Sequence, residues 1–294
     1  MRLLLELVLS GIMVGSIYAL VALGWTVIYK CSGVLNLAMG ELTLIGAYVC
    51  LTYYQWGFPF PVALVATLIT GFILGLVTER LFLRRMIGEP ILSIIMITAG
   101  LSFFFRAVVG FVWGTDTVVF TPPVFPQEPL RFFGMVFGQV YLWSFAAAIL
   151  LLLVFVWFFA RSRWGLAMQA TADDETAALS LGVSAKWVYA LAWAIAFMAA
   201  GVGGTLLGNI NGLNISVGYL GLLVLPAVVL GGLNSVPGAI VGGIAIGVLQ
   251  NLSDVYIGPL TQGGVKEIAP FVFMIGVLLI RPYGLWGWVR IERV

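Results

Sequence analysis

The chain has 294 residues, of which 62% are hydrophobic and 9% are charged, and its mean hydropathy is +1.12. A soluble domain carries roughly 25% charged residues, so this composition predicts a polytopic membrane protein. The formal net charge of +2 gives no electrostatic basis for nucleic-acid binding. The chain has no histidine, and none of its lysines follows a glycine. It therefore lacks a histidine base and a P-loop, and we expect no catalytic residue, metal site or cofactor.

Apolar runs occur along the whole chain, which we interpret as a single membrane domain covering 1–294. A spanning helix needs about 20 mostly apolar residues. The predicted fold class is all-α and polytopic, with about eight to ten transmembrane or re-entrant helices. The expected spans lie near 4–29, 34–53, 60–82, 91–113, 139–160, 187–208, 219–232, 238–252 and 267–281. The seventh and eighth are short, so either could be a broken or re-entrant helix.

The basic residues indicate an orientation, because cytoplasmic loops carry an excess of Lys and Arg. In this layout ten of the 14 basic residues fall on one side of the membrane. The loop 161–187 and the C-terminus are then cytoplasmic, and the N-terminus is outside. The N-terminal end is the least determined, since only Arg2 and Glu6 lie near it.

A carboxylate stands out in the stretch 33–46, where Glu41 follows Asn36 and glycines flank both residues. A charge at membrane depth costs at least about 2.5–3.5 kcal/mol on insertion scales, and such residues mark pathways or partners. The pattern predicts an unwound or re-entrant stretch. Two interpretations of Glu41 stay open: an element of a translocation path or gate, and an anchor just inside the cytoplasmic interface.

Other polar residues within or at the ends of the spans have structural explanations. Arg106, inside the fourth span, is expected to snorkel toward Asp116 and form an ion pair. Asparagines within 209–214 end the sixth span, and polar residues within 250–254 end the eighth. We expect both groups to lie in solvated loops at the outer interface.

The loop 161–187 is predicted to hold one short helix, from about Ala172 to Leu181. Thr171 would cap its start, acidic residues would complement the positive helix N-terminus, and Gly182 would stop it. About ten residues are marginal as a helix in water, so this helix needs a surface, either the chain's own helices or a soluble partner. The candidate coupling residues are Thr171, Asp173, Asp174, Glu175, Ala178, Leu181 and Gly182, with Ala178 and Leu181 on the face to be buried.

Three separated motifs then resemble one family. The stretches 15–29, 33–41 and 46–48 closely resemble the opening of the branched-chain amino acid permeases of ABC importers. The loop 163–183 resembles that family's coupling segment, and 230–243 resembles its late glycine-rich motif. The chain departs from the family in two places. Met39 stands where a His usually precedes the Gly-Glu pair, and Met168 and Gln169 stand where an Arg-Ala pair is common.

The resemblance implies a type II ABC importer permease fold and a transport subunit of the bacterial inner membrane without its own ATPase site. Its partners would be a second permease, most often in a heterodimer, two cytoplasmic ATP-binding subunits and an external solute-binding protein. The solute would be a branched-chain or other amino acid, with urea, a short amide or a small carboxylate as further members of the family's range. The candidate path residues are Tyr18, Asn36, Met39 and Glu41. A stand-alone channel or ion-coupled carrier using Glu41 is the alternative, and a structural scaffold is a third.

Overall fold

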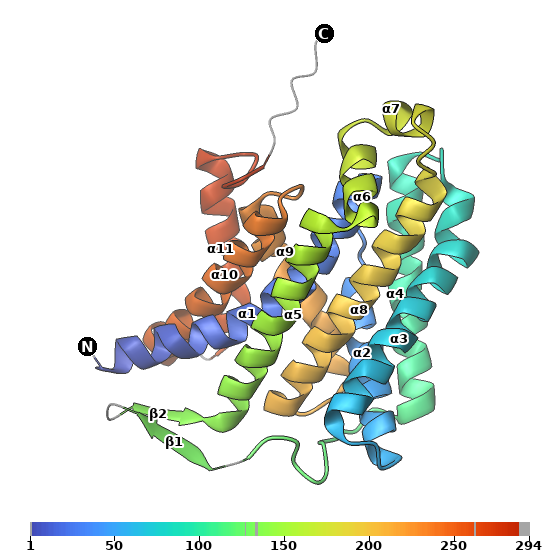
Figure 1. Cartoon of the computed structure of the whole chain (residues 1–294). Helices are drawn as coiled ribbons and strands as arrows, with labels where there is room; N and C mark the ends of the chain where they lie inside the picture. The colour runs from blue at the N-terminus through green and yellow to red at the C-terminus, as the bar shows by residue number, and fades with distance from the viewer. Residues whose placement is uncertain (1, 127, 133–134, 262, 288–294) are drawn as a thin grey trace.

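The computed structural model describes residues 2–126, 128–132, 135–261 and 263–287. The described chain forms a bundle of helices with one small antiparallel hairpin (Figure 1). The helices are α1 (Arg2–Ser32), α2 (Met39–Gln55), α3 (Phe60–Thr78), α4 (Ile91–Trp113), α5 (Gln139–Arg161), α6 (Arg163–Asp173), α7 (Glu175–Ser180), α8 (Ala185–Asn211), α9 (Leu220–Gly231), α10 (Val236–Tyr256) and α11 (Val265–Ile280). The strands are β1 (Pro129–Phe132) and β2 (Met135–Gly138), and short irregular turns of helix are η1 (Glu79–Leu83), η2 (Arg84–Met86), η3 (Ile215–Tyr219) and η4 (Gly258–Leu260).

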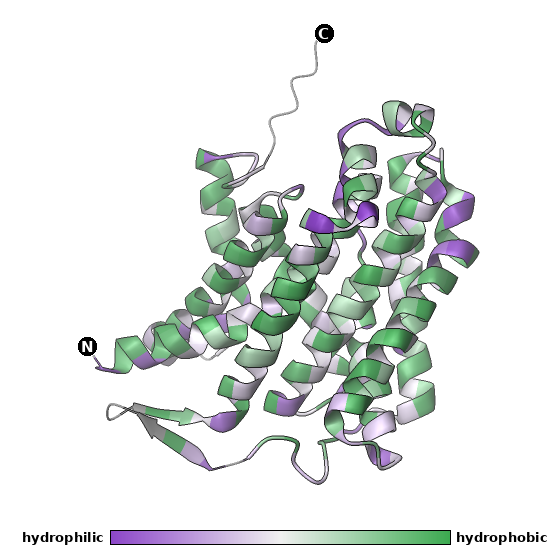
Figure 2. Cartoon of the chain, in the orientation of Figure 1, coloured by the Kyte–Doolittle hydropathy of each residue, from purple (hydrophilic) through white to green (hydrophobic). Residues whose placement is uncertain are grey.

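The bundle has two opposite ends. One end carries α7 and is called here the α7 end; the other carries β1 and β2 and is called the hairpin end (Figure 1). Apolar residues follow the lengths of the helices between them, and polar residues gather toward the two ends (Figure 2). This distribution is typical of helices that cross a bilayer, where apolar side chains face lipid.

Each predicted span corresponds to a helix in the described part of the chain, which confirms the all-α polytopic fold class. Six helices are long and apolar enough to cross a membrane: α1, α3 with its extension to Met86, α4, α5, α8 and α10. The helices at the other three predicted spans are shorter, with 17 residues in α2, 12 in α9 and 16 in α11. The prediction was wrong at one boundary, because α2 begins at Met39 and the preceding residues 33–38 are not helical.

Helices α1, α2 and α8 form the centre of the bundle, because most of their residues are buried. The apolar window of α8 is 89% buried and that of α1 is 67% buried, against 22% for α3 and 17% for α4. Glycines allow this centre to pack closely. A Cβ at Gly15 of α1 would lie 2.7 Å from the Cα of Ile244 in α10, and a Cβ at Gly75 of α3 would lie 2.5 Å from the Cα of Ala194 in α8. Small residues at crossing points are how helices associate when lipid is as apolar as they are.

The basic residues divide between the two ends as the sequence predicts. Three of them lie at the hairpin end: Arg2, Arg131 and Lys266. Most of the described basic residues lie at the α7 end: Lys30, Arg80, Arg84, Arg85, Arg161, Arg163, Lys186 and Arg281. Arg290 and Arg293 are also expected on the cytoplasmic side, but they are outside the described residues.

Candidate translocation site and coupling segment

The unwound stretch predicted within 33–46 is non-helical at 33–38 only, because α2 begins at Met39 and includes Glu41. Gly33 takes a φ of 69°, a left-handed conformation that glycine adopts without steric cost, and the chain stays non-helical until Met39. Asn36 is fully buried here, and its Oδ1 accepts a hydrogen bond of 3.0 Å from the N–H of Ala38. Its Nδ2 has no hydrogen-bond partner among the described residues. The Oγ1 of Thr98 in α4 accepts a hydrogen bond of 3.3 Å from the N–H of Leu37.

The unwound stretch leads to an ion pair between α2 and α4. Both Nη2 and Nε of Arg106 donate to Oε1 of Glu41, at 2.6 and 3.1 Å. The Glu41 side chain is 2% exposed and that of Arg106 is 28% exposed. The Cζ of Arg106 also lies 4.7 Å from the centroid of the Tyr219 ring, a cation–π contact. The expected pairing of Arg106 with Asp116 was wrong, because a buried Glu41 without a partner would carry a much larger desolvation cost.

This site lies near the middle of α4. At 1.5 Å per residue, Thr98 is about 10 Å from the helix end at Ile91, and Arg106 is about 10 Å from the opposite end at Trp113. Glu41 pairs with Arg106 and is therefore held within the bundle. Its two interpretations, an element of a path or gate and an anchor of a helix end, both stay predictions, since Glu41 lies in the first turn of α2.

Three glycines make room for the pair. A Cβ at Gly40 would overlap the carbonyl oxygen of Gly218 in η3, and a Cβ at Gly221 would overlap the backbone of Gly40. A Cβ at Gly218 would lie 3.2 Å from both Arg106 Nη2 and Glu41 Oε1. The start of α2 therefore packs directly on the backbone of η3 and α9, with the ion pair at the edge of this contact.

The other two candidate path residues serve packing. Met39 is fully buried, and its Cε lies where a side chain on Gly24 of α1 would stand. Tyr18 is 4% exposed inside α1 and belongs to the main apolar core. In the described chain, no hydrogen bond joins Tyr18 to Asn36 or Glu41. The structure thus brings Asn36, Met39 and Glu41 together by chain proximity and leaves Tyr18 in the core.

Two residues of the site were missed from the sequence. Tyr219, which ends η3, was expected only as the first residue of the span 219–232, and Arg106 was assigned a different partner. The available signal was that Glu41 and Arg106 are each an isolated charge in an apolar segment, and opposite charges in the same membrane tend to pair.

The loop at the α7 end contains two helices, not the single one predicted from 172 to 181. Ser162 caps α6, and its Oγ accepts a hydrogen bond of 2.8 Å from the N–H of Gly165. Asp174 caps α7, and its Oδ1 accepts a hydrogen bond of 2.9 Å from the N–H of Ala177. The expected cap at Thr171 was wrong: Thr171 lies inside α6, where its hydroxyl donates to the carbonyl of Ala167. Asp173 ends α6, so only Glu175 lies in the first turn of α7.

The predicted stop at Gly182 is confirmed. Gly182 has a φ of 86°, and the N–H of Val183 donates to the carbonyl of Ala178 at 3.0 Å, a pattern that closes a helix C-terminus. The predicted apolar face was wrong in its grouping. Ala178 is 2% exposed and is covered by this chain itself, whereas Leu181 is 83% exposed.

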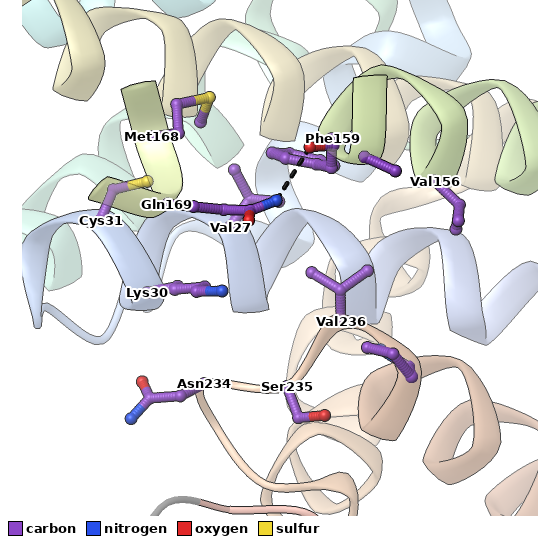
Figure 3. Close-up of a pocket in the computed structure, with 12 residues that line it drawn as sticks. Val27, Lys30, Cys31, Val156, Phe159, Met168, Gln169, Asn234, Ser235 and Val236 are labelled. Carbon is purple, nitrogen blue, oxygen red and sulfur yellow. Dashed lines mark hydrogen bonds between the residues drawn. The ribbon is translucent and has the colours of Figure 1, made fainter. Parts of the chain in front are cut away.

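The α6 helix is fixed to the bundle. A Cβ at Gly165 would lie 2.7 Å from the Cα of Phe159 in α5, so the two helices touch through their backbones. Gln169 Nε2 donates to the carbonyl of Phe159 at 2.8 Å (Figure 3). Beside this bond lies a cavity of about 300 Å³ between α1, α5, α6 and the loop from α9 to α10, and Lys30 and Ser235 line it (Figure 3). The loop is thus in direct contact with the ends of the spanning helices.

The polar residues at 209–214 and 250–254 are only partly solvated. Gln250 is 1% exposed, and neither of its amide atoms has a hydrogen-bond partner in the part of the chain that the structure describes. Asn251 Nδ2 donates to Ser10 Oγ of α1 at 2.9 Å. Asn209 Nδ2 donates to the carbonyl of Thr205 within α8. The expectation of a solvated loop was therefore wrong for Gln250, because close packing of α10 covers it.

Exchange of the α7 amides tests the cap at Asp174. Hydrogen bonds from the Thr176 hydroxyl and the Ala177 N–H lower the pKa of Asp174 below its usual value. The carboxylate therefore caps α7 at neutral pH, and this stabilisation is lost only as the pH falls below the ordinary range for Asp. Asp174→Ala is expected to speed amide hydrogen exchange in 175–181 several-fold at pH 7, whereas Asp174→Asn, which keeps an acceptor, stays near wild type. Equal exchange in all three proteins would contradict the cap.

A bundle of long apolar helices with polar residues toward its two ends defines a polytopic α-helical membrane protein. The chain belongs to the family described as the branched-chain amino acid transport system permease component, whose model matches residues 7–280.

Similar proteins agree with this assignment. The chain is 32% identical to the high-affinity branched-chain amino acid transport system permease protein LivH of Salmonella typhimurium, over 99% of this chain and 97% of that one. It is 31% identical to LivH of Escherichia coli K12 over the same shares of each chain. It is 30% identical to the permease protein BraD of Pseudomonas aeruginosa, over 99% of this chain and 98% of that one.

One solved structure has a similar fold. A chain of PsaBC from Streptococcus pneumoniae, determined in complex with Fab, aligns with a TM-score of 0.50 at 13% identity. The alignment covers 93% of this chain and 91% of that one. At this identity the likeness concerns the fold alone, and it agrees with the all-α polytopic fold class.

Proposed function

We propose that this chain is the membrane-spanning subunit of an ATP-binding-cassette importer that carries a small polar solute, with branched-chain amino acids as the first candidates. The observation that carries the proposal is the partly exposed ion pair of Glu41 and Arg106 at mid-depth. The names of the relatives support the solute class.

The exposure of Arg106 supports a polar route along this face. Its side chain is 28% exposed and Tyr219 is 51% exposed, at a level where a bilayer has no water. A charged group in contact with lipid tails at this depth is costly, so such residues face other protein or a water-filled cavity. We therefore place the solute route beside α4 and η3, closed on the other side by a second permease subunit in a heterodimer.

Energy for transport would come from partners. The chain has no P-loop, so two cytoplasmic ATP-binding subunits would hydrolyse ATP, and an external solute-binding protein would deliver the solute. The ATPase contact would lie on the outer face of α7, where Leu179 is 50% exposed and Leu181 is 83% exposed. The chain would lie in the inner membrane with its C-terminus in the cytoplasm.

Transport in proteoliposomes tests this function against its alternatives. The permease is purified with its co-expressed partners and reconstituted, and uptake of radiolabelled L-leucine is measured with the binding protein supplied. We expect uptake that requires ATP and persists when ionophores remove ion gradients. Uptake without ATP that collapses with a proton or sodium gradient would identify a carrier that uses Glu41. Normal uptake in cells after deletion of the chain would favour a structural scaffold.

Labelling of single cysteines tests the orientation. Glu89 and Thr115 are both exposed and lie just beyond the two ends of α4. On a background without Cys31 and Cys50, a membrane-impermeant thiol reagent added to intact cells is expected to label Thr115→Cys and not Glu89→Cys. Labelling of Glu89→Cys alone would invert the topology and contradict a cytoplasmic α7 end.

A further inference from the structure

The described residues contain two arginine–carboxylate pairs of similar burial, and their geometries differ. At the α7 end, Arg84 meets both oxygens of Glu79, with Nε 3.2 Å from Oε1 and Nη2 2.9 Å from Oε2. This is the bidentate arrangement in which guanidinium and carboxylate satisfy each other. At mid-depth, both donating nitrogens of Arg106 meet the same oxygen, Oε1 of Glu41. In the mid-depth pair, therefore, only one of the two carboxylate oxygens of Glu41 accepts hydrogen bonds from Arg106.

Two groups of the mid-depth pair remain available. No hydrogen bond within the described residues reaches Oε2 of Glu41, and the hydrogen bonds of Arg106 to Glu41 use only Nε and Nη2. The Tyr219 ring lies against the guanidinium at 4.7 Å, and Tyr219 also makes a side-chain hydrogen bond with Arg106. A guanidinium has five N–H donors, so donors remain beyond those that Glu41 and Tyr219 use. The missing side chain at Gly218 lets the backbone of η3 approach the pair closely, since a Cβ there would lie 3.2 Å from both Arg106 Nη2 and Glu41 Oε1. The site thus has N–H donors of Arg106 and the Oε2 oxygen of Glu41 that are not used within the pair.

We propose that the Glu41–Arg106 pair binds the charged groups of a zwitterionic amino acid during its passage. The free donor of Arg106 takes the α-carboxylate of the solute, and Oε2 of Glu41 takes its α-ammonium group. This inference rests on the proposed importer function and specifies how the route recognises its solute. Tyr219 is a positioning residue, because it holds Arg106 and needs no contact with the solute.

Charge balance favours a zwitterion at this site. The pair has no net charge, and a zwitterion adds none, so the occupied and empty sites both remain neutral. A free small carboxylate would bring an uncompensated negative charge next to Glu41, and an uncompensated charge in a buried site is strongly unfavourable. Urea and short amides would bind through neutral hydrogen bonds, which are weaker than charge-assisted ones. Among the solute classes that the family implies, the site therefore selects amino acids.

Neutralising the pair separates binding from a structural role. Glu41→Gln with Arg106→Gln removes both charges together, so neither partner is left as a lone buried charge. The matched control is Glu79→Gln with Arg84→Gln, which neutralises the other pair. Uptake of L-leucine, ATP hydrolysis stimulated by loaded binding protein, and recovery of the assembled complex are measured for both double variants in proteoliposomes.

We expect the Glu41/Arg106 double variant to assemble and to keep ATP hydrolysis, while L-leucine uptake falls roughly tenfold or more, as expected for lost hydrogen bonds to charged groups. The control is expected to transport within about twofold of wild type, as for a merely structural pair. Uptake by the Glu41/Arg106 double variant equal to that of the control would overturn the proposal.

A second variant covers the case in which the double variant does not assemble. Arg106→Lys keeps the positive charge beside Glu41 and removes the planar set of donors. We expect it to assemble and to need a several-fold higher L-leucine concentration for half-maximal uptake, and unchanged concentration dependence would overturn the proposal. Failure of the importer function itself is visible separately, because wild type would then show no ATP-dependent L-leucine uptake.

Discussion

Leu181→Arg is expected to abolish ATP-driven uptake while the permease stays folded in the membrane. Leu181 is 83% exposed beside Leu179 at 50%, outside the spanning helices, and an exposed apolar pair there is typical of a contact surface. An arginine would place an unpaired charge in that contact, which costs roughly 2 kcal/mol or more and weakens ATPase binding at least tenfold. The measurement is the amount of ATP-binding subunit that co-purifies with the permease.

Two control substitutions show whether the effect of Leu181→Arg is specific to the contact with the ATP-binding subunit. Leu260 in η4, at the opposite end, is 82% exposed, and Leu260→Arg is expected to leave co-purification unchanged. Ala178→Arg is expected to lower the yield of the permease itself, because Ala178 is 2% exposed within its own chain. Full uptake and normal co-purification in Leu181→Arg would exclude α7 as the coupling contact.

Gly40→Ala is expected to cause the second large loss, at the mid-depth site. The new Cβ would overlap the carbonyl oxygen of Gly218 and lie 3.0 Å from the backbone nitrogen of Gly221. Backbone atoms cannot rotate away as a side chain can, so η3 and α9 would have to move from α2. Overpacking of this kind costs about 1–3 kcal/mol. Because η3 carries Tyr219, we expect both a lower Tm and loss of L-leucine uptake.

Gly100→Ala is the matched control in α4, since a Cβ at Gly100 has nothing within 4 Å. With no overpacking there, the change is expected to leave stability unchanged or to raise it by about 0.5–1 kcal/mol, because Ala is the better helix former. A Gly40→Ala protein with the Tm and uptake of Gly100→Ala would show that α2 and η3 do not depend on this close approach.

The spans were predictable because the length of an apolar run is a local property of the sequence. The break before α2 was predictable in part: Gly33 and Asn36 indicated an unwound stretch within 33–46, but not that the helix resumes at Met39, before Glu41. The Glu41–Arg106 pair was not, because it joins residues that are 65 positions apart and depends on how α2 and α4 pack. No sequence pattern in α2 or α4 specifies how these two helices are aligned against each other.

In the loop 161–187, the helix starts could not be predicted from the sequence. The sequence predicted one helix capped at Thr171, whereas Asp174, which is also a favourable N-cap residue type, caps α7 in the structure. Packing against the bundle decides where the helices begin and end. Gly165 and Met168 are buried, so α6 extends through Thr171, and Asp174 caps the next helix, α7. The exposure of Leu181 against the burial of Ala178 likewise follows from how α7 lies on the bundle.

Water access to the face beside Arg106 tests the central claim, that this mid-depth site borders the solute route. Tyr219, in contact with Arg106, is 51% exposed, and Ile69, near the middle of α3, is 57% exposed. On a background without Cys31 and Cys50, a small charged thiol reagent is applied to the assembled complex carrying Tyr219→Cys or Ile69→Cys. The account predicts reaction at Tyr219→Cys, slowed by L-leucine with its binding protein, and none at Ile69→Cys. Equal failure of both cysteines to react would show that lipid or dry protein covers the site, and would contradict the claim.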